Sequence, residues 1–186
     1  MKFILGKKLG MTTIYDDNGA QNVTLVECAE NKVTLIKTEE KDKYNAVQIE
    51  TAKTKNKSVK KEFRIAGTEL KEGAVIDVSI FEVGDKVQVS GVTKAKGFQG
   101  VVKRHGFKGA PKTHGHKHDL RAPGSIGSGF PEHVVKGKRM AGRMGGVRVT
   151  SKNLKIVYID KEKNVLGLVG AVPGVQGRIV EIKSLQ

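Results

Sequence analysis

Residues 94–152 read KAKGFQGVVKRHGFKGAPKTHGHKHDLRAPGSIGSGFPEHVVKGKRMAGRMGGVRVTSK, and they divide the chain into two chemically different parts. This stretch contains 14 of the 34 Lys and Arg residues, all five His and 12 of the 23 Gly, but only two acids, Asp119 and Glu132. It therefore carries +12 of the total net charge of +15. It has no long apolar run with a helix or strand period, so it cannot bury enough apolar surface to offset its ordering entropy. We predict an irregular basic arm that takes its shape from a polyanion, most simply structured RNA.

The rest of the chain is nearly neutral. It holds 20 basic and 17 acidic side chains, a net charge of +3, in 127 residues, which suffice for a hydrophobic core. The single cysteine, Cys28, lies in the apolar run VTLVECA and is predicted to be a buried free thiol. We therefore predict a globular body, residues 1–93 plus 153–186, with the arm, residues 94–152, inserted between two strands.

The body consists of short apolar or alternating runs separated by turn residues. The expected strands are Phe3–Leu5, Met11–Tyr15, Asn22–Glu27, Lys32–Ile36, Asn45–Glu50, Val75–Ile80, the run that follows the Gly84-Asp85 turn and reaches Val89, Lys155–Asp160, Val165–Val172 and Arg178–Ile182. The sequence Asp16-Asp17-Asn18-Gly19 predicts a hairpin turn because Asn and Gly tolerate positive φ. Glu39–Tyr44 is expected to be a loop, and Phe63–Lys71 to hold one helical turn. About eight to ten short strands with little helix predict a mainly β fold, a closed or nearly closed β-barrel.

The segment Thr51–Lys61, TAKTKNKSVKK, is rich in lysine and contains no acid. Two interpretations fit this composition equally well. One is a solvated loop, and the other is a second RNA contact beside the arm.

Several other classes of function are disfavoured. The N-terminus MKFILGKKLGM has only three consecutive apolar residues after Lys2, which is too short for a secretory signal, and no stretch approaches the length of a membrane span. Basic lipid-binding segments prefer an amphipathic helix, which the arm does not show. We therefore expect that the protein neither associates with a membrane nor has a small-molecule substrate.

The histidine-rich string His114-Gly115-His116-Lys117-His118-Asp119 has alternating imidazoles that could surround a metal ion. It resembles the His-x-His-x-Asp-His motif of binuclear metallohydrolases, but its last two residues are reversed and no apolar strand precedes it. Nearby cations would also disfavour a divalent metal. We favour imidazoles that stack on bases or bind phosphate oxygens, and we expect no metal and no cofactor.

The glycine-rich stretches 124–129 and 142–146 lack the Walker spacing and do not join a strand to a helix, so nucleotide binding is disfavoured. Glycine here is predicted to let the backbone approach RNA and adopt unusual φ and ψ. No set of acids, serines and histidines has a rigid scaffold for catalysis, and we expect no catalytic residue.

The cations and imidazoles of the arm are the predicted RNA contacts. In 136–145 they alternate with small residues and with two methionines four residues apart, a pattern that a disordered linker does not require. The predicted contacts are Lys94, Lys96, Lys103, Arg104, His105, Lys108, Lys112, His114, His116, Lys117, His118, Arg121, Lys136, Lys138, Arg139, Arg143, Arg148 and Lys152.

One part of the arm carries no charge. The tip, residues 123–130, has cations on both sides and apolar groups that could contact bases. Its predicted functional residues are Gly124, Ser125, Ile126, Gly127, Ser128, Gly129 and Phe130.

Six segments together make the chain recognisable. They are Gly6–Thr12 (GKKLGMT), Lys94–Gly100 (KAKGFQG), Thr113–Gly115 (THG), Pro123–Gly127 (PGSIG), Lys136–Gly142 (KGKRMAG) and Gly170–Gly174 (GAVPG). In this order they resemble the large-subunit ribosomal protein L-three family, bacterial type, across nearly the whole chain.

The resemblance implies a translation-protein-type β-barrel on the ribosome surface and an arm that penetrates large-subunit rRNA. It implies that the tip approaches the peptidyl transferase centre, that the protein acts early in subunit assembly, and that L-fourteen and L-nineteen type proteins are neighbours. It also implies a ribosomal location in the cytoplasm. Some bacterial members have a methylated glutamine in the tip, but residues 128–133 here read SGFPEH and contain none.

Two other functions remain open from the sequence. One is a freestanding RNA-binding or RNA-chaperone protein, and the other is a metal-dependent hydrolase that acts on RNA. A high-salt wash of large subunits separates the first from a ribosomal protein, and metal analysis separates the second.

Overall fold

In the computed structural model, which describes residues 2–16, 19–54, 56–65 and 70–185, most of the regular structure is β-strand. The elements are β1 (Phe3–Asp16), β2 (Gly19–Glu27), β3 (Asn31–Lys37), α1 (Glu39–Asp42), β4 (Ala46–Thr54), β5 (Lys57–Arg64), β6 (Val75–Ile76), the 3-10 helix η1 (Val78–Ile80), β7 (Lys86–Val92), β8 (Phe98–Gln99), α2 (Val101–His105), β9 (Gly142–Arg143), β10 (Arg148–Asp160), β11 (Val165–Val169) and β12 (Ile179–Ser184). The predicted mainly β fold is confirmed. The chain divides into two units, Met1–Thr93 with Arg148–Gln186 and Lys94–Val147.

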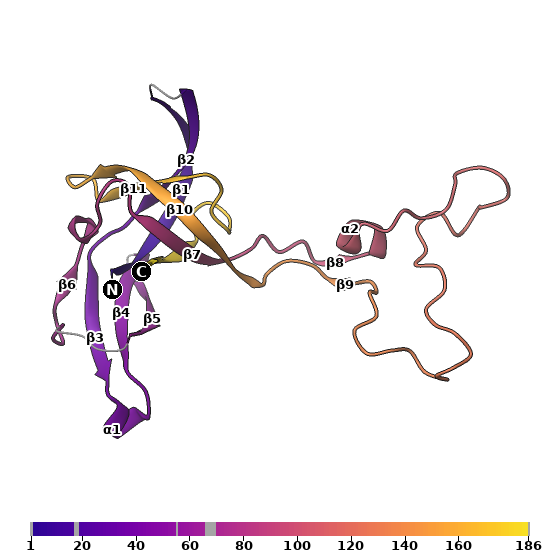
Figure 1. The fold of residues 1–186 in the computed structure, drawn as a ribbon, viewed down its shortest axis with the longest axis horizontal. Helices are drawn as coiled ribbons and strands as arrows, with labels where there is room; N and C mark the ends of the chain where they lie inside the picture. The colour runs from indigo at the N-terminus through magenta and orange to yellow at the C-terminus, as the bar shows by residue number, and fades with distance from the viewer. Residues whose placement is uncertain (1, 17–18, 55, 66–69, 186) are drawn as a thin grey trace. The chain divides into compact units, whose positions relative to one another are not determined.

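Six strands of the first unit pair in a closed ring. The order is β1-β12-β7-β10-β11-β2, and every neighbouring pair is antiparallel. The pairing of β1 with β12 sets Phe3 opposite Lys183, so the two ends of the chain lie side by side (Figure 1). The ring is the frame from which the segment between β7 and β10 leaves and to which it returns.

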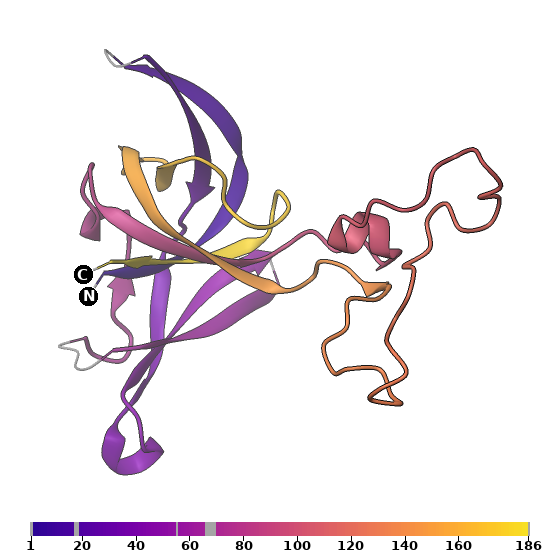
Figure 2. The same ribbon diagram turned by 45° about the vertical axis from the view of Figure 1, so that its right-hand side comes forward.

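A four-stranded sheet, in the order β5-β4-β3-β6, packs against this ring (Figure 2). The two sheets share one hydrophobic core, in which the rings of Phe3 and Phe63 stack with centroids 4.8 Å apart. Asn31 joins them through polar contacts, because its buried side-chain amide donates to the Leu5 carbonyl over 3.1 Å and its Oδ1 accepts from the Leu5 N–H over 3.3 Å. Cys28 is a buried free thiol, as predicted, and burial raises its pKa well above the ordinary value.

The first hairpin differs from its predicted form. Phe3–Leu5 and Met11–Tyr15 belong to a single strand, β1, with an irregularity between Lys8 and Gly10. The predicted hairpin is confirmed by pairing down to Asp16 and Gly19, although two of the predicted turn residues, 17 and 18, lie outside the described residues. A bulge lets one strand continue while its direction changes, which apolar periodicity alone does not reveal.

The lysine-rich segment Thr51–Lys61 is not a loop. It forms the end of β4 and much of β5, with Thr51 opposite Val59 and Ala52 opposite Ser58. Thr51 is buried, whereas the described lysines of the segment are exposed. Strand β5 lies at the edge of its sheet, where lysines oppose strand addition by another chain. Its edge position therefore explains the high lysine content, which would be unfavourable in a central strand.

Three further expectations need correction. Val75–Ile80 is not one strand: β6 ends at Ile76, and Asp77 caps η1 by accepting the Ser79 N–H over 2.9 Å. Ile76 and Val78 are nevertheless buried, while Ile80 is only half-buried. Glu39–Tyr44 contains the short helix α1, and the predicted helical turn at 63–71 falls partly in β5 and partly on residues 66–69, outside the described residues.

The region predicted as the arm, 94–152, also contains regular structure. Strand β10 begins at Arg148, so the last five predicted arm residues are strand, paired in part with β7. Within 94–147 the structure has β8, α2 and β9, where none was expected. Strands β8 and β9 depend on pairing between segments about forty residues apart, so no local pattern predicts them.

Candidate nucleic-acid interface

The two ends of the unit 94–147 pair with each other, and we call this paired region its base. Phe98 pairs with Arg143 and Gln99 with Gly142 in the short β8–β9 ladder. Beside it, the Lys96 N–H donates to the Met144 carbonyl and the Met144 N–H donates to the Gly97 carbonyl, each over 2.9 Å. The segment with the regularly spaced methionines is therefore held by backbone hydrogen bonds, which agrees with the prediction that it is not a plain linker.

Gly145 shows why this base requires glycine. Its φ is +72°, and a Cβ built on it would lie 1.9 Å from the Lys94 carbonyl oxygen. No side chain fits there without moving one of the two segments. The sequence predicted close approach of glycine backbone to RNA, whereas at this position the approach is to the chain's own backbone.

The helix α2 fixes a second contact across the unit. It begins after Gly100 and ends at His105, and the following Gly106, with a φ of +74°, provides a left-handed C-cap. The Arg104 guanidinium donates to the Met140 carbonyl over 2.7 Å, and His105 Nε2 lies 3.0 Å from the same oxygen. Both side chains are half-buried. These two predicted RNA contacts therefore hold the unit together, a role that composition could not indicate.

The other predicted contacts of 94–147 lie on its surface. Lys94, Lys96, Lys103, Lys108, Lys112, His114, His116, Lys117, His118, Arg121, Lys136, Lys138, Arg139 and Arg143 are all exposed. Every residue of this unit is described, and none of its cations forms an ion pair with a carboxylate of a described residue. All of the ion pairs found in the described residues join side chains of the other unit. The unit thus presents 12 Lys and Arg against two acids, with no internal neutralisation.

Arg148 and Lys152 lie elsewhere. Both belong to β10, in the first unit, and both are exposed. The Arg148 guanidinium forms an ion pair with Glu181 of β12. The structure therefore assigns these two predicted contacts to the first unit.

The histidines do not assemble a metal site. Within the described residues, no three His, Cys, Asp or Glu side chains come together as ligands for a metal ion. A hollow of about 610 Å³ beside the string is lined by His116 and Asp119, together with residues such as Phe107 and Pro123. His114 has a φ of 60°, so the alternating imidazoles follow a turn and not a straight strand.

The tip is an open surface. Residues 123–130 are all exposed; Phe130 is 85% exposed and Ile126 is 44% exposed. The Ser125 hydroxyl donates to the Gly127 carbonyl over 2.8 Å. A Cβ added at Gly127 would meet no atom within 4 Å. An uncharged loop with two exposed apolar side chains can contact the faces of nucleic-acid bases.

Among the described residues, no helix has the length and apolar character needed to cross a membrane. The fold and this surface together define a β protein with a large unpaired cationic segment, the kind of chain that binds nucleic acid.

Known proteins are similar along the whole chain. The family model for Ribosomal protein L3 matches residues 17–167. The Large ribosomal subunit protein uL3 of Alkaliphilus metalliredigens is 43% identical, with 99% of this chain and 97% of that protein covered. The uL3c protein of Guillardia theta is 47% identical, with 97% and 98% covered, and the uL3 protein of Chlorobium phaeobacteroides is 43% identical, with 99% of each covered. The chain belongs to the ribosomal protein L3 family, as the sequence motifs indicated.

Proposed function

We propose that residues 94–147 are an rRNA-binding arm of a structural protein of the large ribosomal subunit. As a member of the L3 family, the chain is a structural component of that subunit and not an enzyme. One observation carries the assignment of the arm: a continuous segment with 12 Lys and Arg and no internal ion pair. Such a segment neutralises phosphates and releases their counterions, which is the main source of affinity for nucleic acid.

Two finer features belong to the same proposal. The closed ring of strands is a translation-protein-type barrel, which stays outside the rRNA while the arm, 94–152 by sequence and 94–147 by the position of β10, enters it. The tip, residues 123–130, reaches toward the peptidyl transferase centre and contacts bases through Ile126 and Phe130. Its lack of charge and its open surroundings support a role in positioning nearby nucleotides.

The partners follow from this arrangement. Large-subunit rRNA is the main one, and L-fourteen and L-nineteen type ribosomal proteins are the proposed neighbours. The protein acts early in assembly, because phosphate anchors of the arm fix rRNA segments before the subunit is compact. The proposed location is the ribosome of the cytoplasm.

The test compares two matched double variants. Lys138→Ala with Arg139→Ala removes two exposed cations of the arm, and Lys41→Ala with Lys71→Ala removes two exposed cations of the body that form no ion pair within the described residues. Each lost phosphate contact lowers the slope of log affinity against log salt by roughly 0.7–0.9. The arm variant should therefore lose about 1.4–1.8 in slope and yield fewer mature large subunits by sedimentation.

The body control should retain both the slope and the yield. Equal effects of the two variants would show that only total charge matters, and they would contradict a dedicated arm. Dissociation of the wild-type protein from large subunits in a high-salt wash would favour a freestanding RNA-binding protein instead.

A further inference from the structure

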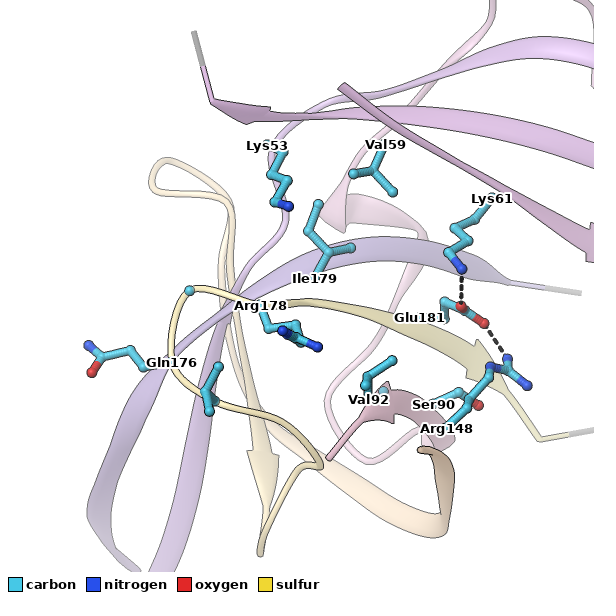
Figure 3. A pocket seen from close by; sticks show the side chains of 13 residues that line it. Lys53, Val59, Lys61, Ser90, Val92, Arg148, Gln176, Arg178, Ile179 and Glu181 are labelled. Atoms are coloured by element: carbon cyan, nitrogen blue, oxygen red, sulfur yellow. Dashed lines mark hydrogen bonds and ion pairs between the residues drawn. The ribbon is translucent and has the colours of Figure 1, made fainter. Parts of the chain in front are cut away.

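The body has a groove of its own, distinct from residues 94–147. It has a volume of about 470 Å³ and lies between the β4–β5 hairpin and strands β7 and β12 of the ring. Four cations line it, Lys53, Lys61, Arg148 and Arg178 (Figure 3). All of them come from the first unit, so the groove is a property of the body alone.

One side of the groove is held by a carboxylate. Glu181 has a side chain only 16% exposed, and it forms ion pairs with Lys61, at 3.5 Å, and with Arg148. These pairs, drawn as dashed lines in Figure 3, join β5 and β10 to β12. Because two cations share one carboxylate, this cluster keeps a positive charge while its side chains are fixed in place.

The other two cations have no such partner. Lys53 and Arg178 form no ion pair with a described residue. The backbone of Arg178 is nevertheless anchored, because its carbonyl accepts the Lys8 N–H over 3.0 Å and its N–H donates to the Val175 carbonyl over 3.3 Å. Both cations therefore line the groove without a carboxylate partner among the described residues, and Arg178 extends from an anchored backbone.

Part of the lining of this groove is apolar. Val59, Val175 and Ile179 line the groove, and none is fully buried; Val175 remains 38% exposed. A site for a simple anion needs no such wall. Cations beside an aliphatic surface suit a ligand with a charged group and a flat apolar group, and a nucleotide of an RNA strand has both.

We propose that this groove is a second RNA site, which holds one nucleotide of an rRNA strand outside the arm. Lys53 and Arg178 bind its phosphate, and the nucleoside lies on Val59, Val175 and Ile179. The RNA strand continues along the β4–β5 hairpin, where Lys57 is exposed and no acid occurs between residues 51 and 61. This inference rests on the proposed function, because membership of a ribosomal family favours RNA over an acidic peptide as the partner.

The experiment uses the full chain and large-subunit rRNA as the probe. Lys53→Ala with Arg178→Ala should lower the salt slope by roughly 0.7–0.9, because the two cations bind one phosphate. Val175→Ser should weaken binding without changing the slope, because it removes apolar contact and no charge. Lys41→Ala with Lys71→Ala is the charge-matched control, and a thermal melt of each variant checks that the body is folded.

A second readout locates the RNA. With 4-thiouridine in the probe, ultraviolet crosslinks should appear in the peptide containing Val175 and should be lost in the Lys53 and Arg178 variant. If that folded variant binds and crosslinks like wild type while the Lys138 and Arg139 variant is weakened, the groove inference fails and the arm assignment stands. If neither variant is weakened, both fail. Displacement of RNA from the groove by polyglutamate at equal charge concentration would overturn the choice of RNA as ligand.

Discussion

Replacing Gly145 by alanine tests how the base of the arm is built. The residue has a φ of +72°, in the left-handed region, and its new Cβ would lie 1.9 Å from the Lys94 carbonyl oxygen. That atom is backbone, so it can give way only if the segments before β8 and after β9 separate. The hydrogen bonds between Lys96, Gly97 and Met144 lie next to this point and should be disturbed with it.

The loss of RNA affinity in this variant has two causes, the strained backbone of the new alanine and its clash with Lys94. A non-glycine residue in the left-handed conformation costs about 1–2 kcal/mol. If RNA binding requires the closed base, that strain alone lowers affinity for large-subunit rRNA about 5- to 30-fold, at 1.36 kcal/mol for each factor of ten. The clash with Lys94 adds to this loss. The salt slope should not change, because no phosphate contact is removed.

Two other glycines of the arm separate these effects in the same binding assay. Gly106 has a φ of +74° but open space around its Cβ position, so Gly106→Ala carries strain without a clash. Gly127 has neither a positive φ nor a neighbour, so Gly127→Ala should bind like wild type. The expected order of affinity is Gly127→Ala, then Gly106→Ala, then Gly145→Ala. Wild-type affinity for Gly145→Ala would refute the idea that the arm binds RNA with its base closed.

Three further predictions concern the core, the pH dependence and the tip. Leu168→Ala should lower the free energy of unfolding by about 2–5 kcal/mol in urea denaturation, since Leu168 is fully buried in β11, and a smaller loss would mean that the ring repacks there. A hydrogen bond from Lys2 lowers the pKa of Asp85 below its ordinary 3.8, so Asp85 stabilises the fold above that pH and the effect is lost as pH falls; Asp85→Asn should flatten the acid limb of a stability profile, and an unchanged limb would contradict this. Gly127→Asp or Ser128→Arg should permit subunit assembly but alter peptidyl transfer or inhibition by drugs that bind at the peptidyl transferase centre. Wild-type results in all of these assays would mean that the tip does not influence that centre.

Much of the body follows from local sequence patterns. The hairpin at 16–19 and the one around Lys161–Asn164 combine turn residues with apolar runs on both sides, so local chemistry and final pairing agree. The lysine-rich strand β5 could not be predicted in this way. Its pairing with β4 and the burial of Thr51 and Phe63 outweigh the poor strand propensity of lysine.

The candidate site is predictable in composition but not in detail. The arm is apparent from charge alone, because a segment with 12 Lys and Arg residues and two acids cannot form a hydrophobic core of its own. Charge does not tell which cations face outward. Arg104 and His105 contact the Met140 carbonyl, and Arg148 contacts Glu181, through pairings more than thirty residues apart. Such contacts depend on tertiary structure, which no local pattern encodes.

The central claim is that the arm supplies most of the affinity for RNA. The most direct measurement replaces residues 94–147 by a short Gly/Ser linker, which leaves β7 and β10 intact, and follows binding to large-subunit rRNA over a range of salt. A cooperative thermal melt would first establish that the body folds without the arm. If each of the 12 lost cations neutralises one phosphate, the slope of log affinity against log salt falls by up to about 8–11. The account predicts that most of the slope and most of the affinity disappear, whereas a folded body that keeps both would contradict it.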